Sequence, residues 1–101
     1  MKFLAIEQSV PGAGGDQCRP YLRAEAERAW ELYESGVLRE LYFRSDRDAA
    51  VLMMECLNRE EVEEILATLP LVREGLIRFD VIPLVPYPGF KRLFGAEGTG
   101  N

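Results

Sequence analysis

The residues best suited to chemistry gather in residues 36–57, the run GVLRELYFRSDRDAAVLMMECL. Arg39 and Tyr42 alternate there with apolar side chains, and Glu55 follows in the second apolar run. A guanidinium can clamp a carboxylate or an enolate, and a phenol can donate a hydrogen bond to developing negative charge. A buried carboxylate with a raised pKa, at Glu55 or at Glu7, could act as a proton shuttle. The pattern favours proton transfer on a small molecule, with these four residues as catalytic candidates.

Three further side chains are candidates for binding a substrate. Arg44 could hold an anion, and Trp30 and Tyr33 could form the walls of a pocket. Each candidate also has a structural interpretation. An aromatic stripe at helical spacing is more often part of a core, and Glu and Arg on neighbouring strands can neutralise one another within a dimer interface. Both interpretations stay open on the sequence alone.

Composition removes several classes of function. A chain of 101 residues, 48% of them hydrophobic, is the size of one domain with a modest core. A formal charge of −5 argues against binding to nucleic acid, which relies on clustered Lys and Arg. The absence of histidine excludes His-based triads and most transition-metal sites, and Cys18 and Cys56 lack CxxC spacing. We therefore expect no metal, no cofactor and no disulfide.

The hydropathy pattern also bears on location. No window approaches the run of about 20 apolar residues that spans a bilayer. The opening MKFLAIEQ is too short for the apolar core of a signal peptide. We therefore expect a cytoplasmic protein that does not engage a membrane.

Hydrophobic periodicity divides the chain into six elements in the order βαββαβ. The elements are expected at residues 1–8, 21–34, 37–44, 49–57, 58–69 and 76–84. The glycine-rich segment 9–19 lacks the GK[ST] ending of a phosphate loop, so it is expected to be a mobile connection or a lid over a pocket. The order predicts an α+β, ferredoxin-like fold with a four-stranded antiparallel sheet. Residues 1–94 would form this single domain and residues 95–101 a flexible tail.

The two helices carry recognisable signals. The first has apolar residues at helical spacing and stops at Gly36. Its expected buried stripe comprises Leu22, Ala26, Ala29, Trp30 and Tyr33. The second begins with Asn58 as N-cap and Glu61 as its capping-box partner, with Leu57 and Val62 as a hydrophobic staple.

Strand parity assigns side chains to the two faces of the sheet. Arg39 is expected to face the helices together with Leu41 and Phe43. The opposite face carries a few charged or polar residues among apolar ones: Glu40, Tyr42, Arg44, Glu55, Arg78 and Asp80. An apolar open face of this kind predicts a homodimer, or a larger homo-oligomer, that pairs sheet against sheet.

Three segments carry a resemblance to a known group of proteins: GVLRELYFR at 36–44, TLPLVREGLIRFDVIPL at 68–84 and PYPGF at 86–90. They resemble the dimeric α+β barrel superfamily, and within it the muconolactone isomerase-like proteins. The resemblance implies two sheets paired into a barrel, with a small-molecule pocket either between sheet and helices or toward the dimer interface. It also implies an Arg-His-Leu-Trp run, of which this chain keeps Arg39 but has Glu40 in place of the histidine. A carboxylate or a tyrosine would have to move the proton, and haem, which commonly needs an axial histidine in this superfamily, is not expected.

The expected function is that of an isomerase or cyclase acting by proton transfer on a small anionic or aromatic-derived metabolite. Two alternatives remain. One is a cofactor-independent monooxygenase whose apolar pocket is lined by Trp30, Tyr33 and Tyr42. The other is a non-catalytic binding or assembly protein, in which the space between sheet and helices would be filled and closed.

Overall fold

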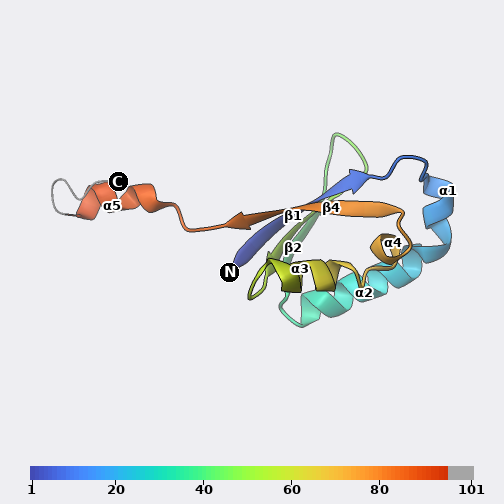
Figure 1. The fold of residues 1–101 in the computed structure, drawn as a ribbon, viewed down its shortest axis with the longest axis horizontal. Coiled ribbons are helices and arrows are strands. Elements are labelled where there is room, and N and C mark those ends of the chain that lie inside the picture. The colour runs from blue at the N-terminus through green and yellow to red at the C-terminus, as the bar shows by residue number, and fades with distance from the viewer. Residues whose placement is uncertain (96–101) are drawn as a thin grey trace.

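A computed structural model describes residues 1–95, and it places four strands and several helices in two layers (Figure 1). The strands are β1 (Lys2–Ser9), β2 (Leu38–Phe43), β3 (Ala50–Glu55) and β4 (Ile77–Leu84). The helices are α1 (Gly15–Cys18), α2 (Leu22–Glu34), α3 (Arg59–Leu66), α4 (Pro70–Arg73) and α5 (Lys91–Phe94), with single 3-10 turns at Arg19–Tyr21 and Pro88–Phe90. The sheet order is β2-β3-β1-β4 and every neighbouring pair is antiparallel. Helices α2, α3 and α4 cover one face (Figure 1), which confirms the predicted βαββαβ fold. Within segment 9–19, which was expected to be a mobile connection or a lid, residues 15–18 form the short helix α1.

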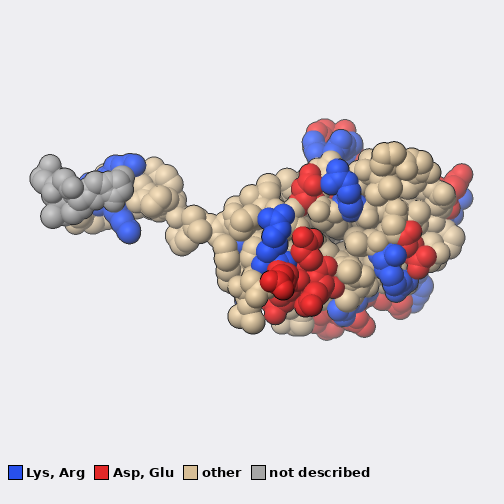
Figure 2. Space-filling view, viewed as in Figure 1, with Lys and Arg blue, Asp and Glu red and all other residues tan. Residues whose placement is uncertain are grey.

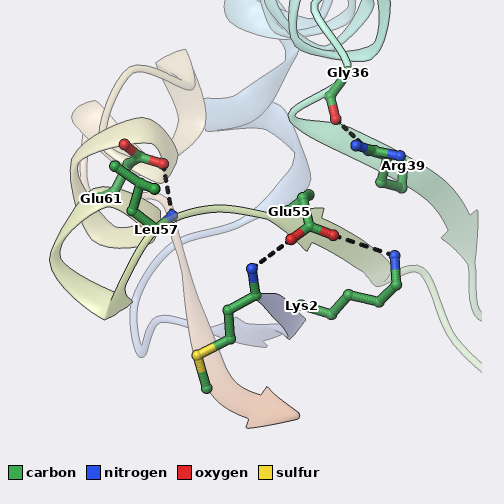
Figure 3. Close-up of polar contacts among 7 residues, drawn as sticks. Lys2, Gly36, Arg39, Glu55, Leu57 and Glu61 are labelled. Atoms are coloured by element: carbon green, nitrogen blue, oxygen red, sulfur yellow. Dashed lines mark hydrogen bonds and ion pairs between the residues drawn. The ribbon is translucent and has the colours of Figure 1, made fainter. Parts of the chain in front are cut away.

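The start of α3 follows from its sequence signal. The Asn58 side chain accepts a hydrogen bond from the Glu61 backbone N–H at 2.8 Å, which caps the helix as predicted. Glu61 in turn accepts from the N–H of Leu57 at 3.0 Å (Figure 3), one residue before the N-cap. The predicted staple is wrong, because Leu57 is 82% exposed and does not pack on the helix.

The core lies between the sheet and the helices. Its fully buried large side chains are Phe3, Leu38, Met54 and Val62. On β4 the helix-facing set is Ile77, Phe79 and Val81, as parity predicted. These residues fix the sheet against α3 and α4 and leave more room beneath α2.

The predicted buried stripe of α2 is wrong. Leu22, Trp30 and Tyr33 are all more than half exposed, and Leu32 is the buried residue of this helix. The inward line of α2 instead runs through Glu25, Ala29 and Leu32, which repeat at helical spacing. Because this line begins with a carboxylate and a small residue, the helix does not fill the space above the sheet.

A β-bulge interrupts the parity of β2. Leu38 pairs with Met54 and Leu41 pairs with Leu52, and the register shifts between Leu38 and Glu40. Arg39 is therefore the extra residue of the bulge, and alternation does not fix its direction. Strict alternation placed Leu41 and Arg39 toward the helices, and both line the space beside α2. Glu40 and Tyr42, which it assigned to the opposite face, line that space as well, so this part of the prediction is wrong.

After β4 the chain leaves the domain. Figures 1 and 2 show residues 85–95 as an arm that projects away from the sheet, joined by a narrow neck. The arm carries large exposed apolar side chains: Val85, Tyr87, Phe90, Leu93 and Phe94. Of the tail predicted at 95–101, residues 96–101 lie outside the described residues. Within residues 1–95, no helix is long and apolar enough to cross a membrane.

Candidate active site

A cavity of about 750 Å³ lies between α2 and the sheet. Strand residues from all four strands line it, together with α2 and the glycine-rich segment that includes α1. Most of the lining is apolar, and the size is that of a site for a small organic molecule. Segment 9–19, expected to be a mobile connection or a lid over a pocket, contributes Val10, Ala13 and Cys18 to the wall. The polar side chains in its wall determine which reaction the cavity could support.

Glu7 enters the cavity from β1. It lies just beyond the last β1–β3 pair, Ile6 with Val51, on the same side of the strand as the buried residues Phe3 and Ala5. One of its carboxylate oxygens accepts a hydrogen bond from the backbone N–H of Ala50 at 2.9 Å. The side chain thus extends the strand pairing by one bond, which fixes the carboxylate at the wall of the cavity.

Glu25 enters from α2, and it is the site residue that the sequence interpretation missed. Its carboxylate accepts a hydrogen bond from the N–H of Leu71 at 2.9 Å. Leu71 is the second residue of α4, so this N–H has no partner inside its own helix. Helical spacing could have identified Glu25 in the sequence. It lies seven residues before the buried Leu32, and residues seven apart share one face of a helix.

The environment raises the pKa of Glu25. Burial is the largest cause, and the negative charge of Glu7 raises the pKa further. The hydrogen bond from Leu71 and the charge of Arg73 act in the opposite direction but do not cancel the rise. The cavity therefore holds two interacting carboxylates, one of which has a raised pKa, in a mostly apolar wall. Such a pair is suited to accepting and returning a proton.

Glu55 lies outside this cavity, near the end of β3. Its carboxylate is held between the amino group of Met1 and the ammonium of Lys2, the latter at 3.3 Å. Figure 3 shows the contact with Lys2. These two hydrogen-bonded cations lower the pKa of Glu55. The expectation of a buried Glu55 with a raised pKa is therefore wrong, since the carboxylate is surface-exposed and paired with positive charge.

Arg39 lines a second, more open groove between α2 and β2. Its Nε donates to the carbonyl oxygen of Gly36 at 2.5 Å (Figure 3). Trp30 and Tyr33 line the same groove, with their ring centroids 5.8 Å apart. The groove adjoins the cavity, because Leu41 and other residues of α2 and β2 line both.

Tyr42 and Arg44 have local partners. The Tyr42 hydroxyl, at the shared edge of the cavity and the groove, donates to Glu40 at 2.9 Å, and this bond raises the pKa of Tyr42. Arg44 forms two hydrogen bonds with Asp46, at 2.9 and 2.7 Å, which raise the pKa of Arg44 and lower that of Asp46. Arg44 does not line the cavity or the groove. Of the seven residues predicted from sequence, Glu7 and Tyr42 line the cavity.

The described part of the chain contains no cluster of side chains that could bind a metal. Across residues 1–95, no three His, Cys, Asp or Glu side chains come together in a way that could hold an ion. Cys18 is partly exposed and Cys56 is buried, and both are free thiols. The groups that the cavity offers are carboxylates, hydroxyls and a thiol.

Comparison with known proteins agrees with this fold. The muconolactone delta-isomerase family model matches residues 4–89. A crystal structure of muconolactone isomerase is similar with a TM-score of 0.72 and 21% identity, covering 87% of this chain and 92% of that one. A 5-chloro-2-hydroxyhydroquinone dehydrochlorinase from Burkholderia phenoliruptrix AC1100, in complex with 2,5-dihydroxybenzoquinone, is similar with a TM-score of 0.63 and 20% identity, covering 86% and 96%. No curated protein matches the sequence. The family match spans most of the chain, and the chain therefore belongs to the muconolactone delta-isomerase family.

Proposed function

We propose that this protein is an isomerase that moves a proton within a small ring-shaped metabolite bound between α2 and the sheet. The observation that carries the proposal is the pair of carboxylates, Glu7 and Glu25, in an apolar cavity that can hold such a molecule. A delta-isomerase shifts a carbon–carbon double bond, which requires removal of a proton from one carbon and its return at another. Membership of the muconolactone delta-isomerase family supports this class of reaction.

In the proposed mechanism Glu25 is the shuttle. Its raised pKa brings the carboxylate closer to the basicity needed to take a proton from a carbon next to a carbonyl group. The electron pair left behind moves onto the carbonyl oxygen as an enolate, and the same carboxyl then returns the proton at the far carbon. Glu7, held by the N–H of Ala50, helps to keep the pKa of Glu25 raised. Tyr42 and Arg39, at the edge shared with the groove, are the proposed contacts for whatever part of the substrate projects from the cavity.

The two alternatives have less support. One expectation was a monooxygenase pocket lined by Trp30, Tyr33 and Tyr42. Trp30 and Tyr33 instead line the outer groove, whereas Glu7 and Glu25 line the cavity. A non-catalytic protein was expected to have a filled space under α2, and a cavity of about 750 Å³ counts against that interpretation.

The test is a kinetic comparison of two glutamates on the same helix. We would assay unsaturated lactones by the change in ultraviolet absorbance as the double bond moves. Glu25→Gln removes the base and keeps the shape of the side chain, so kcat should fall by about 10²–10⁴-fold. The control, Glu27→Gln, changes an exposed residue that does not line the cavity and should retain wild-type kcat. Wild-type turnover by Glu25→Gln would refute the assignment.

We also propose that the chain forms a homodimer through the open face of its sheet. Support comes from the apolar residues on the face opposite the helices, which are partly exposed in the single chain: Leu4, Ile6, Val51, Met53 and Ile82. The projecting arm, residues 85–95, supplies further apolar surface that a second copy could cover. An interface of this kind would give a small domain additional buried surface.

A further inference from the structure

Residues 10–18 form one wall of the cavity without being bonded to the rest of that wall. Their inward side chains, Val10, Ala13 and Cys18, are half-buried and line the cavity. Across residues 1–95, no hydrogen bond or ion pair joins residues 10–18 to the sheet, to α3 or to α4. Figure 1 shows the segment leaving the end of β1, passing through α1 and returning to α2. Apolar contacts and the two chain ends therefore hold it in place.

The polar contacts of this segment are made within it. The N–H of Gly14 donates to the side chain of Gln17 at 2.8 Å. The N–H groups of Gln17 and Cys18 donate to the carbonyl oxygen of Gly14, at 3.0 and 3.3 Å. Asp16 and Arg19 form an ion pair at 2.9 Å. The segment can therefore move away from the cavity without breaking a hydrogen bond to the core.

A tight turn sets the position of this segment at its start. The N–H of Ala13 donates to the carbonyl oxygen of Val10 at 3.0 Å, and Gly12 between them has a φ of +84°. Proline followed by a residue with positive φ is the pattern of a type II turn, in which glycine or asparagine takes the second of these places. A Cβ on Gly12 would meet nothing within 4 Å. A substitution there therefore acts through the backbone conformation alone.

We propose that residues 10–18 form a lid, which swings away from the cavity to admit a ligand and returns to cover it. The inference rests on the proposed function, because that function places a ligand in this cavity. A cover of this kind holds the substrate in place through both proton transfers, and it makes the release of product depend on opening. The turn at Gly12 sets the resting position of the lid.

The test uses Cys18 as a reporter, because its side chain faces the cavity from the lid. We would measure its alkylation by iodoacetamide in the full-length protein, without a ligand, by peptide mass spectrometry. Gly12→Ala should raise the rate at Cys18 about fivefold or more, since alanine disfavours the left-handed conformation by a factor of roughly 5–30. Gly12→Asn should stay within about twofold of wild type, because asparagine tolerates this turn position.

Two internal controls separate lid movement from a general loss of stability. Gly36 has nearly the same φ, +86°, and lies directly after α2, outside the lid. Gly36→Ala imposes the same kind of strain there and should leave the rate at Cys18 unchanged. Cys56 is buried in the core and should stay unreactive in every variant. Equal rates at Cys18 in Gly12→Ala and wild type, an equal rise in Gly36→Ala, or a parallel rise at Cys56 would each overturn the lid.

Hydrogen exchange of the wild type decides the question even where a variant does not fold. One turn of helix without tertiary hydrogen bonds is marginal in water, so the amides of Ala13, Gln17 and Cys18 should exchange at least about tenfold faster than those within α2. Exchange as slow as in α2 would mean a fixed wall and would overturn the lid. Rapid exchange and the Gly12→Ala effect, without turnover of any lactone, would refute the proposed function alone. Turnover that depends on Glu25, with equal Cys18 rates in both proteins, would refute the lid alone.

Discussion

Glu25 joins α2 to α4 through a single hydrogen bond, and the value of that bond can be measured. Its carboxylate accepts from the N–H of Leu71, a buried residue at the start of α4. Glu25→Ala removes the acceptor and leaves this N–H without a partner in its own helix. Glu25→Gln keeps an acceptor oxygen at the same place. Since both variants remove the charge, the difference between them isolates the hydrogen bond.

The expected difference follows from the environment of the donor. A buried N–H left without a partner costs about 1–3 kcal/mol. With a central value of about 2 kcal/mol, Glu25→Ala should melt roughly 8–16 °C below Glu25→Gln, at about 4–8 °C per kcal/mol for a domain of this size. The measurement is thermal unfolding followed by circular dichroism, with all proteins at one concentration because self-association would shift the melting temperature.

A second pair of variants supplies the control. Glu27→Ala and Glu27→Gln differ by the same atoms on the same helix, and Glu27 makes only a long contact of 3.9 Å with Arg23. Alanine and glutamine have similar helix propensities, so this pair should differ by a few tenths of a kcal/mol. If the two Glu25 variants also melt within about 2 °C of each other, the hydrogen bond to Leu71 does not stabilise the fold, and this prediction is refuted.

Three other predictions concern titration, helix capping and association. Because the folded state raises the pKa of Glu25 above its usual 4.5, this residue stabilises the fold most below pH 4.5 and less as pH rises through the raised pKa. The free energy of unfolding of wild type, relative to that of Glu25→Gln, should therefore fall between pH 4.5 and pH 7. A difference that does not change with pH would contradict the raised pKa. Asn58→Ala should lower the free energy of unfolding, measured in urea, by about 1 kcal/mol, and Asn58→Asp should lower it much less, since aspartate also caps a helix. If both variants lose the same free energy, capping is not the cause. Val51→Asp, on the open face of the sheet, should convert a dimer to a monomer in sedimentation velocity, whereas Leu57→Asp, outside the strands and already 82% exposed, should not. A wild-type protein that is monomeric at micromolar concentration would refute the proposed dimer.

Local signals in the sequence predicted the fold well, because they act over a few residues. The Asn58 cap and the alternation along β4 each depend on neighbours in the chain, and both are confirmed. The errors occur where tertiary packing decides. The aromatic residues Trp30 and Tyr33 appeared to form a buried stripe, but the inward side of α2 is set by Leu32 and by the cavity beside it.

The candidate site was harder to predict than the fold. Glu7 was identified from its strand, whereas Glu25 was missed because it lies among exposed charges on α2 and its partner, Leu71, is 46 residues away. Alternation assigned Arg39 to the helix side and Tyr42 to the opposite face, yet both line the groove beside α2, because a β-bulge interrupts the alternation of β2. Glu55 was expected to be buried, yet the amino group of Met1 and Lys2 hold it at the surface, a contact that strand parity cannot reveal.

Exchange of substrate hydrogen with solvent tests the role of Glu25 as the proton shuttle. A lactone substrate incubated with the enzyme in D₂O would be followed by proton NMR. If Glu25 takes a proton from carbon and returns one after contact with solvent, deuterium should appear at the carbon that receives the proton, at a rate reduced by about 10²–10⁴-fold in Glu25→Gln and unchanged in Glu27→Gln. Incorporation at the wild-type rate in Glu25→Gln would contradict the proposed role of Glu25.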